Sequence, residues 1–165
     1  TSKYDKWFKR YSKQYLPFYD YRRLKAICIQ ESGLRPDVSS YVGAKGLCQF
    51  MDPTWGEVAN KLDFPPNSSA YDPQLAIQAS AFYMGQLRQQ WQWPRPEQDR
   101  IDLAEASYNA GLGSILKAQV LSGNLSLYDE IIPQLINVTG EKNSAETRHY
   151  VENIQMYYDN LILLK

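Results

Sequence analysis

Apolar side chains recur at helical spacing along much of this chain, and this periodicity constrains the fold more than any other feature. The clearest stripe joins Leu24, Ile27, Cys28 and Glu31 at positions i, i+3, i+4 and i+7. Side chains with that spacing lie on one face of a helix, so a helix is predicted over residues 21–31. Other stripes are Trp7, Phe8, Tyr11 and Tyr15 near the start and Tyr150, Val151, Ile154, Tyr158 and Leu161 near the end. The chain is therefore predicted to be mainly helical.

Prolines, glycines and capping residues predict where these helices begin and end. An acid followed by proline suits a helix start, because the acid caps the first turn and proline fits the first helical position. Glycine suits a helix end. The predicted boundaries are starts at Asp52-Pro53 and Asp72-Pro73, ends at Gly33 and Gly111, and a last start at a capping box of Asn143 and Glu146. No alternating strand pattern is convincing, although residues 38–49 leave a short β-hairpin open.

The composition fits a single compact domain over residues 1–165, because 44% hydrophobic residues supply one sizeable core. The 18 basic and 18 acidic residues cancel, so bulk charge favours neither nucleic acid nor an anionic membrane surface. The chain has no run of about 18 to 20 apolar residues that would span a bilayer, and its first residues do not form a signal peptide. We expect a monomer with no nucleic-acid partner and no indicated membrane association.

Glu31 is a carboxylic acid on an otherwise apolar helix face. Burial among apolar groups disfavours the charged form, so the pKa of the carboxyl group is predicted to rise and the group to hold a proton near neutral pH. Such a group is a ready general acid. The alternative is a structural salt bridge with Arg22, Arg23 or Arg148, and helical periodicity alone does not separate the two.

The two cysteines do not form a CxxC pair, and His149 is the only histidine, so a zinc site of the usual ligands is not expected. Cys28 and Cys48 are interpreted as buried thiols. A disulfide between them stays open at this level, because the sequence does not give the distance between them. No metal or cofactor is predicted.

Three blocks of sequence resemble the signature of the lytic transglycosylases with a soluble-transglycosylase (SLT), goose-lysozyme-like domain. The first runs from Glu31 to Met51 and holds Glu-Ser, a polar loop with a Gly-Ala pair, and Gly-Leu-Cys-Gln, with Cys48 where the family usually has Met. The others are Ala104-Glu-Ala-Ser-Tyr108-Asn109-Ala110-Gly111 and Glu146-Thr147-Arg148-His149-Tyr150-Val151. They come in the order that the family shows, so the resemblance implies a lysozyme-like helical domain with a substrate cleft.

The resemblance also implies a reaction. The substrate would be the peptidoglycan glycan strand, cut between N-acetylmuramic acid and N-acetylglucosamine, with Glu31 as acid and then base and a 1,6-anhydro sugar as product. The substrate-binding residues implied by position are Ser40, Gln49, Phe50, Met51, Tyr108, Asn109 and Tyr150. For Ser40, Gln49 and Tyr150 a structural hydrogen bond is an equal alternative. Asp37 and Asp52, the nearest second carboxylates, are expected to have structural roles.

Two rival functions remain at this level. A goose-type muramidase would hydrolyse the same bond with water, and a catalytically silent module would bind glycan strands without cutting them. The expected location is the bacterial cell envelope or periplasm, or a phage particle.

Overall fold

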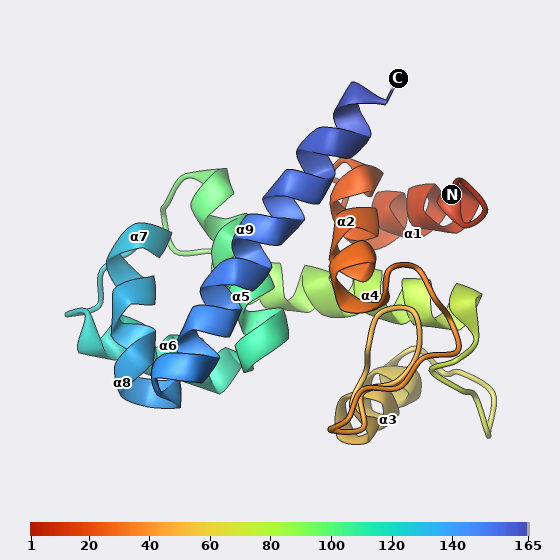
Figure 1. The fold of residues 1–165 in the computed structure, drawn as a ribbon, viewed down its shortest axis with the longest axis horizontal. Coiled ribbons are helices and arrows are strands. Elements are labelled where there is room, and N and C mark those ends of the chain that lie inside the picture. Colours follow the sequence, from red (N-terminus) through yellow and green to blue (C-terminus); the bar gives the residue numbers. More distant parts are fainter. Residues whose placement is uncertain (165) are drawn as a thin grey trace. The chain divides into compact units, whose positions relative to one another are not determined.

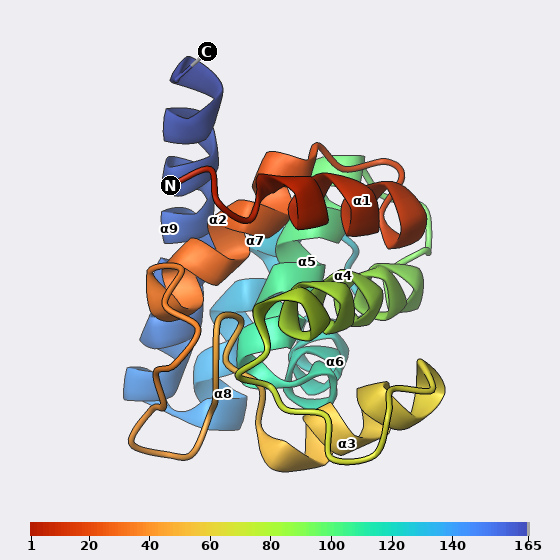
Figure 2. The same ribbon diagram turned by 90° about the vertical axis from the view of Figure 1, so that its right-hand side faces the viewer.

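The computed structural model describes residues 1–164 as a chain of helices (Figures 1 and 2). The elements are α1 (Asp5–Tyr15), α2 (Tyr21–Ser32), α3 (Asp52–Lys61), α4 (Pro73–Gln90), α5 (Glu97–Ala110), α6 (Leu112–Leu121), α7 (Tyr128–Ile131), the 3-10 helix η1 (Ile132–Leu135), α8 (Ile136–Thr139) and α9 (Glu141–Leu163). The prediction of a mainly helical fold is confirmed. No helix within residues 1–164 is both long and apolar enough to cross a membrane.

The helices form two compact units. Unit 1 holds Thr1–Tyr83 and the segment from Ile154 onward, and unit 2 holds Met84–Asn153. The boundaries between the units fall inside α4 and α9. A single domain over residues 1–165 stays a prediction.

In unit 1, α1 and α2 pack against one another. The buried face of α1 includes Phe8 and Tyr11, as the first stripe predicts. The α2 helix begins after Asp20, whose carboxylate accepts a hydrogen bond from the Arg22 N–H at 2.9 Å. It ends at Gly33, whose φ of 66° is left-handed and favours glycine. The predicted helix over residues 21–31 and its stop are confirmed.

The segment from residue 33 to residue 51 leaves α2, turns back, and ends at the start of α3. Two isolated antiparallel bridges order this turn, Ser39 with Lys45 and Lys45 with Phe50. The sequence left a short β-hairpin open in this region, and the structure has these two isolated bridges there. Over residues 1–164 no segment forms an extended strand.

The cysteines correct one interpretation. Cys28 and Cys48, read from the sequence as buried thiols, are both fully buried but form a disulfide with their Cα atoms 4.7 Å apart. The burial was therefore right and the chemical state was wrong. Helical periodicity placed Cys28 on the inner face of α2, but only the return of the loop brings Cys48 beside it.

Of the two helix starts predicted at an Asp-Pro pair, one has the expected aspartate cap and the other does not. Asp72 caps α4, since its carboxylate accepts a hydrogen bond from the Leu75 N–H at 3.1 Å. Asp52 was expected to cap α3 but is instead its first residue, after Met51 as the cap. The Asp52 carboxylate is bound by the Lys45 ammonium group at 2.9 Å, which provides a partner other than the helix end.

Unit 2 contains α5 to α8 and the first part of α9. Helix α5 runs to Ala110 and stops at Gly111, as predicted, and it packs on α6. Trp91 is buried and its indole N–H donates to the Ser107 hydroxyl at 3.0 Å, so this ring packs in the core of unit 2. The short elements α7, η1 and α8 were not predicted, because four residues each are too few to show a helical period.

The start of α9 is a second correction. The capping box predicted at Asn143 and Glu146 is wrong, because α9 already begins at Glu141 and both residues lie inside it. Gly140, with a φ of 88°, ends α8 and allows the chain to enter the next helix without a linker. The Asn143 side chain donates instead to the Thr139 main-chain oxygen at 3.3 Å.

Candidate active site

Glu31 lies on the last turn of α2. Leu24, Ile27 and Cys28, which share its stripe, are fully buried, whereas Glu31 itself is half-buried. The expectation of a carboxyl group enclosed by apolar side chains was therefore too strong. Glu31 is the last residue of the stripe and the only one that reaches the surface. It is therefore partly shielded from water and still accessible to a ligand. A group that exchanges protons with a ligand needs both properties.

Of the three arginines considered as partners for Glu31, Arg22 is engaged elsewhere. Its guanidinium group binds the Asp20 carboxylate, with a closest N···O distance of 2.6 Å. These hydrogen bonds lower the pKa of Asp20 and raise the pKa of Arg22. The pair belongs to the opposite end of α2 and fixes the start of the helix rather than its last turn.

Ser32, the second residue of the Glu-Ser block, holds the loop against α2. Its hydroxyl donates to the Leu47 main-chain oxygen at 2.6 Å and accepts from the Arg35 N–H at 3.2 Å. The Arg35 Nε–H in turn donates to the Ser32 carbonyl at 2.8 Å, at the end of the helix. No role for Ser32 was predicted from the sequence, although its place beside Glu31 was the available signal.

Two further features fix the returning limb of the loop. The disulfide joins Cys48 to α2 one turn before Glu31. Gly46 has a φ of 81°, and a Cβ atom there would overlap the main-chain oxygen of Ala70. Only glycine allows this close approach. Segments before and after the loop therefore clamp it.

Ser40 and Gln49 use part of their side chains to hold the loop itself. The Ser40 hydroxyl accepts from the Ala44 N–H at 2.9 Å. The Gln49 amide NH₂ donates to the Gly46 oxygen at 2.8 Å and to the Val38 oxygen at 3.3 Å. Within residues 1–164, the Gln49 side-chain oxygen accepts no hydrogen bond. This oxygen therefore remains available as an acceptor for a ligand.

Phe50 and Met51 differ in exposure although they are neighbours. Phe50 is buried, with its ring 5.4 Å from that of Trp55 and 6.3 Å from that of Tyr83. Burial raises the pKa of the Tyr83 phenol in this cluster. Met51 is 43% exposed. Of these two residues, both expected to bind substrate, Met51 is accessible from solvent and Phe50 supports the loop from within.

Unit 2 carries the other three predicted site residues, Tyr108, Asn109 and Tyr150. Tyr150 is buried, and the Asn109 side-chain oxygen Oδ1 accepts a hydrogen bond from the Thr147 hydroxyl at 2.7 Å. Asn109 also lines a polar cavity of about 210 Å³. The residues around that cavity are Asn109, Ala110, Thr139, Asn143, Glu146 and Thr147.

This cavity brings together the second and third blocks of the sequence. Glu146 and Thr147 open the Glu-Thr-Arg block, but neither was named as a site residue. The signal that would have found them is their spacing: Asn143, Glu146 and Thr147 lie at i, i+3 and i+4, on one face of α9. A carboxylate, two amides and two hydroxyl groups around a small hollow suit a polar ligand rather than an apolar one.

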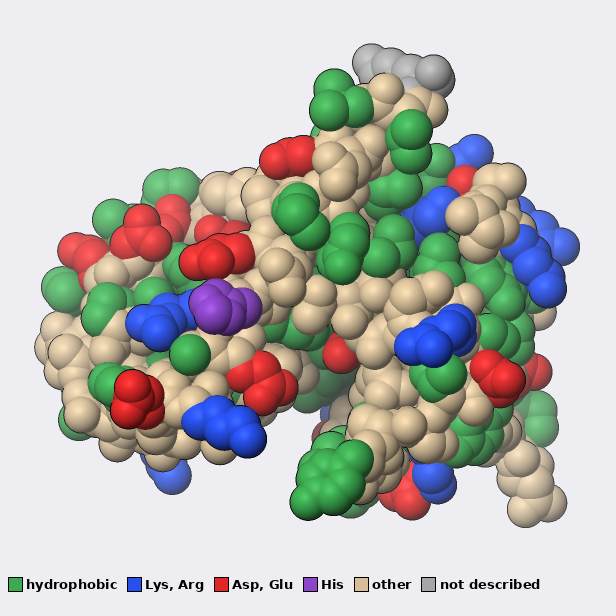
Figure 3. All heavy atoms as spheres, viewed as in Figure 1, with side chains coloured by type: hydrophobic (Ala, Val, Ile, Leu, Met, Phe, Trp, Pro, Cys, Tyr) green, Lys and Arg blue, Asp and Glu red, His purple; other side chains and the backbone are tan. Residues whose placement is uncertain are grey.

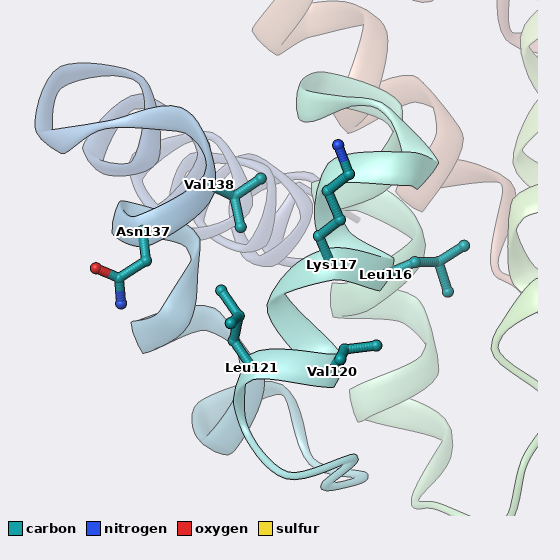
Figure 4. Close-up of a pocket in the computed structure, with 6 residues that line it drawn as sticks. All are labelled: Leu116, Lys117, Val120, Leu121, Asn137 and Val138. Atoms are coloured by element: carbon teal, nitrogen blue, oxygen red, sulfur yellow. The ribbon is translucent and has the colours of Figure 1, made fainter.

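A larger hollow in unit 2 is apolar and holds none of the predicted residues. It measures about 530 Å³ and is lined by Leu116, Lys117, Val120, Leu121, Asn137 and Val138. Figure 4 shows Leu121 of α6 and Val138 of α8 pointing toward one another across it. It offers few hydrogen-bonding groups and no carboxylate, so it is not the place for proton transfer. Within residues 1–164 there is also no group of three or more acidic, histidine or cysteine side chains that suits a metal ion.

A family model described as the transglycosylase SLT domain matches residues 8–130. The chain belongs to this family. The match includes Glu31, the whole loop to Met51, Tyr108 and Asn109, whereas Tyr150 lies beyond its end. The resemblance seen in the sequence is thereby confirmed.

Curated relatives of the SLT family carry the name membrane-bound lytic murein transglycosylase F. The protein of Shewanella halifaxensis is 30% identical over 174 residues, covering 97% of this chain and 34% of that protein. A Pseudomonas putida protein of the same name is 31% identical over 175 residues, covering 96% of this chain and 34% of that protein. The chain thus spans about a third of the length of these relatives.

Solved structures of SLT proteins have the same fold. The lytic transglycosylase Slt of Pseudomonas aeruginosa, studied as an inactive mutant, gives a TM-score of 0.74 at 27% identity over 95% of this chain and 23% of that one. The 70 kDa soluble lytic transglycosylase of Escherichia coli gives 0.70 at 28% identity over 98% and 25%. The lysozyme-like helical fold expected from the sequence is confirmed.

Proposed function

We propose that this chain is a peptidoglycan lytic transglycosylase domain that cleaves the β-1,4 bond between N-acetylmuramic acid and N-acetylglucosamine. The observation that carries the proposal is the setting of Glu31. This carboxyl group is half-buried on the last turn of α2, and the same turns of the helix hold the family loop through Ser32 and Cys28. The family and the names of the relatives supply the substrate class.

The reaction needs one carboxyl group used twice. Protonated Glu31 donates its proton to the bridging oxygen as the bond from that oxygen to C1 of the muramyl sugar breaks. The Glu31 carboxylate then takes the proton of the muramyl C6 hydroxyl while its oxygen forms a bond to C1. The products are a 1,6-anhydromuramyl end and a free hydroxyl on N-acetylglucosamine, and no water is consumed.

The surroundings of the other acids support this single-carboxylate route. Most glycosidases use a second carboxylate as nucleophile or base. Asp37 is exposed on the loop, and Asp52 is exposed with its charge held by Lys45. Neither acid has the half-buried helical setting of Glu31, so the carboxylate that the first step leaves behind is the natural base for the second.

Substrate contacts are proposed for the remaining predicted residues. The free Gln49 oxygen would accept a hydrogen bond from a sugar amide or hydroxyl, while Met51 and Ser40 would line the cleft from the loop. Tyr108 and Tyr150 would bind substrate from unit 2, as the family resemblance implies, and Asn109 would bind a sugar amide beside the polar cavity of the same unit.

The disulfide supports a location in the cell envelope. Such bonds form and persist in oxidising compartments such as the bacterial periplasm. The curated relatives are named as membrane-bound enzymes of murein, the polymer of that compartment. We propose that the domain acts there as a monomer.

Mass analysis of the soluble products released from purified peptidoglycan tests the proposal. Transglycosylation gives anhydromuramyl ends, which are lighter than reducing ends by one water. Reducing ends would identify a muramidase and overturn the proposed acceptor. Failure to release any fragment, with binding to the polymer retained, would identify a glycan-binding module and overturn catalysis.

A further inference from the structure

The balanced total charge of this protein hides an uneven distribution. Residues 1–25 contain eight Lys and Arg and only two Asp and Glu, so this segment carries a net charge of +6. Residues 26–165 contain ten basic and sixteen acidic residues and carry −6. The net charge of the whole protein is zero, but the region of the first helix is strongly positive.

The surplus cations lie along one side of α1. Lys6, Lys9, Arg10 and Lys13 are separated by three, four or seven residues, apart from the neighbours Lys9 and Arg10, which places them on one side of α1. Lys3 lies in the turn just before the helix, and these five residues are here called the basic face. All five are exposed and make no ion pair with a residue of 1–164. The one acid of α1, Asp5, is bound by the buried Lys25 at 2.7 Å. Nothing acidic on α1 is left to neutralise the face.

Aromatic rings take the place of acidic partners. The Lys6 ammonium lies 5.0 Å from the centre of the Trp7 ring, Lys9 5.2 Å from that of Tyr21, and the Arg10 guanidinium 5.4 Å from that of Tyr11. A ring face attracts a cation but carries no net charge. The positive charges are thus held in place without being compensated.

The basic face also lies away from the proposed catalytic residue. Both ribbon views show α1 at the upper part of unit 1 and the loop of residues 33–51 at its lower part (Figures 1 and 2). Figure 3 shows Lys and Arg side chains gathered at the right-hand edge, over α1. A glycan strand at Glu31 would therefore leave this face uncovered within unit 1.

We propose that the basic face docks the protein on an anionic phospholipid surface. Each Lys or Arg near such a surface contributes about 1 kcal/mol. Four cations on one helix about 16 Å long, with Lys3 in the turn before it, suit a surface of continuous negative charge. Phe18, 72% exposed just beyond α1, suits the apolar layer beneath the headgroups. Because Phe8 and Tyr11 are committed to the core, the helix lies on the surface without inserting.

The test is sedimentation with phosphatidylcholine vesicles that contain or lack phosphatidylglycerol. The variant Lys6→Gln/Lys9→Gln/Arg10→Gln removes three charges from the basic face. Its control, Lys61→Gln/Lys117→Gln/Lys142→Gln, removes three exposed charges from α3, α6 and α9 and so has the same net charge. We expect the parent and the control to bind anionic vesicles alike, and the basic-face variant to bind at least tenfold more weakly, about 1.4 kcal/mol. Added salt weakens the parent as well.

Three results would overturn the proposal: no preference of the parent for anionic vesicles, equal losses in the two variants, or a loss confined to binding of purified peptidoglycan. The last result would assign the basic face to the anionic groups of the wall polymer. Cleavage of soluble glycan fragments should be equal in all three proteins. The docking proposal can therefore fail while the enzyme proposal stands, and the reverse.

Discussion

The Ser32 hydroxyl donates a hydrogen bond to the main-chain oxygen of Leu47 at 2.6 Å. Both residues are buried, so this bond joins the helix that carries Glu31 to the segment that precedes Gln49 without competition from water. The Glu-Ser pair is thus one acid and one anchor on successive positions of α2.

Ser32→Ala should lower the free energy of unfolding by about 1 to 3 kcal/mol, because it leaves the buried Leu47 oxygen without its donor. It should also lower the cleavage rate by loosening the loop. Ser12→Ala is the matched control: Ser12 is equally buried, but its hydroxyl has no partner within residues 1–164, so its loss should be near neutral. Chemical denaturation compares the two, and equal effects would contradict the anchoring role.

Removal of the disulfide by Cys28→Ala/Cys48→Ala should cost about 3 kcal/mol, the amount expected for a closed loop of this size. The separation of 20 residues between the cysteines sets that loop. Unfolding in the presence and absence of a reductant provides the check. The parent should lose stability on reduction and the variant should not respond; a parent indifferent to a reductant would contradict the bond.

Gly46→Ala should destabilise the protein more than Gly43→Ala. Both glycines have a positive φ, 81° and 95°, so each substitution carries a backbone cost on the order of 1 kcal/mol. At Gly43 a Cβ meets no atom within 4 Å, whereas at Gly46 it overlaps Ala70. Thermal unfolding should therefore rank Gly46→Ala well below Gly43→Ala, and the opposite order would refute the close approach.

Asp20 contributes to stability through two separable effects. Its pKa is held below the ordinary value of 3.8, chiefly by hydrogen bonds from the Arg22 side chain. A lowered pKa in the folded state stabilises the protein above the unfolded pKa, and that contribution disappears as the pH falls through the folded value. Asp20→Asn keeps the helix cap but loses the charge, whereas Asp20→Ala loses both and should cost about 1 to 2 kcal/mol at neutral pH.

Unfolding of the parent and the Asp20 variants at neutral and at acidic pH separates these effects. The parent should lose its advantage over Asp20→Asn as the pH drops below about 3.8. An advantage independent of pH would show that the ion pair adds nothing. Asp20→Ala should remain below Asp20→Asn throughout, because it alone lacks the cap.

Glu31→Gln should keep the fold and reduce cleavage by at least about 10² to 10⁴-fold, since the amide cannot release a proton. Asp37→Asn and Asp52→Asn are the matched controls for the single-carboxylate route, and both should retain most activity. Product release from peptidoglycan measures all three. Activity in Glu31→Gln, or its loss in either control, would contradict the proposed mechanism.

Local signals predicted most of the fold. Gly33, Gly111 and Asp72 act through the backbone of their own helix, so the sequence around each is enough to place it. The helix start predicted at Asn143 was wrong for a related reason. Its capping pattern is local, but the preceding Gly140 already allows α9 to begin, so the side chain binds another carbonyl.

The candidate site was predicted in part, because its chemistry follows from residue type and its scaffold from distant contacts. Glu31 was found from the helical stripe and the motif after it. The disulfide and the Ser32 bond to Leu47 depend on where a loop returns, which no spacing in the sequence records. The degree of burial of Glu31 was overestimated for the same reason, since periodicity identifies a face but not where that face leaves the core.

The bridge between Cys28 and Cys48 bears on how the protein is prepared. A recombinant sample folded in a reducing cytosol would carry two free thiols, and the loop of residues 33–51 would lose its one covalent link to α2 and be held by non-covalent contacts such as the Ser32 hydrogen bond. Two laboratories that express the same gene in different compartments would then obtain different specific activities. Titration of free thiols should accompany every assay of this domain.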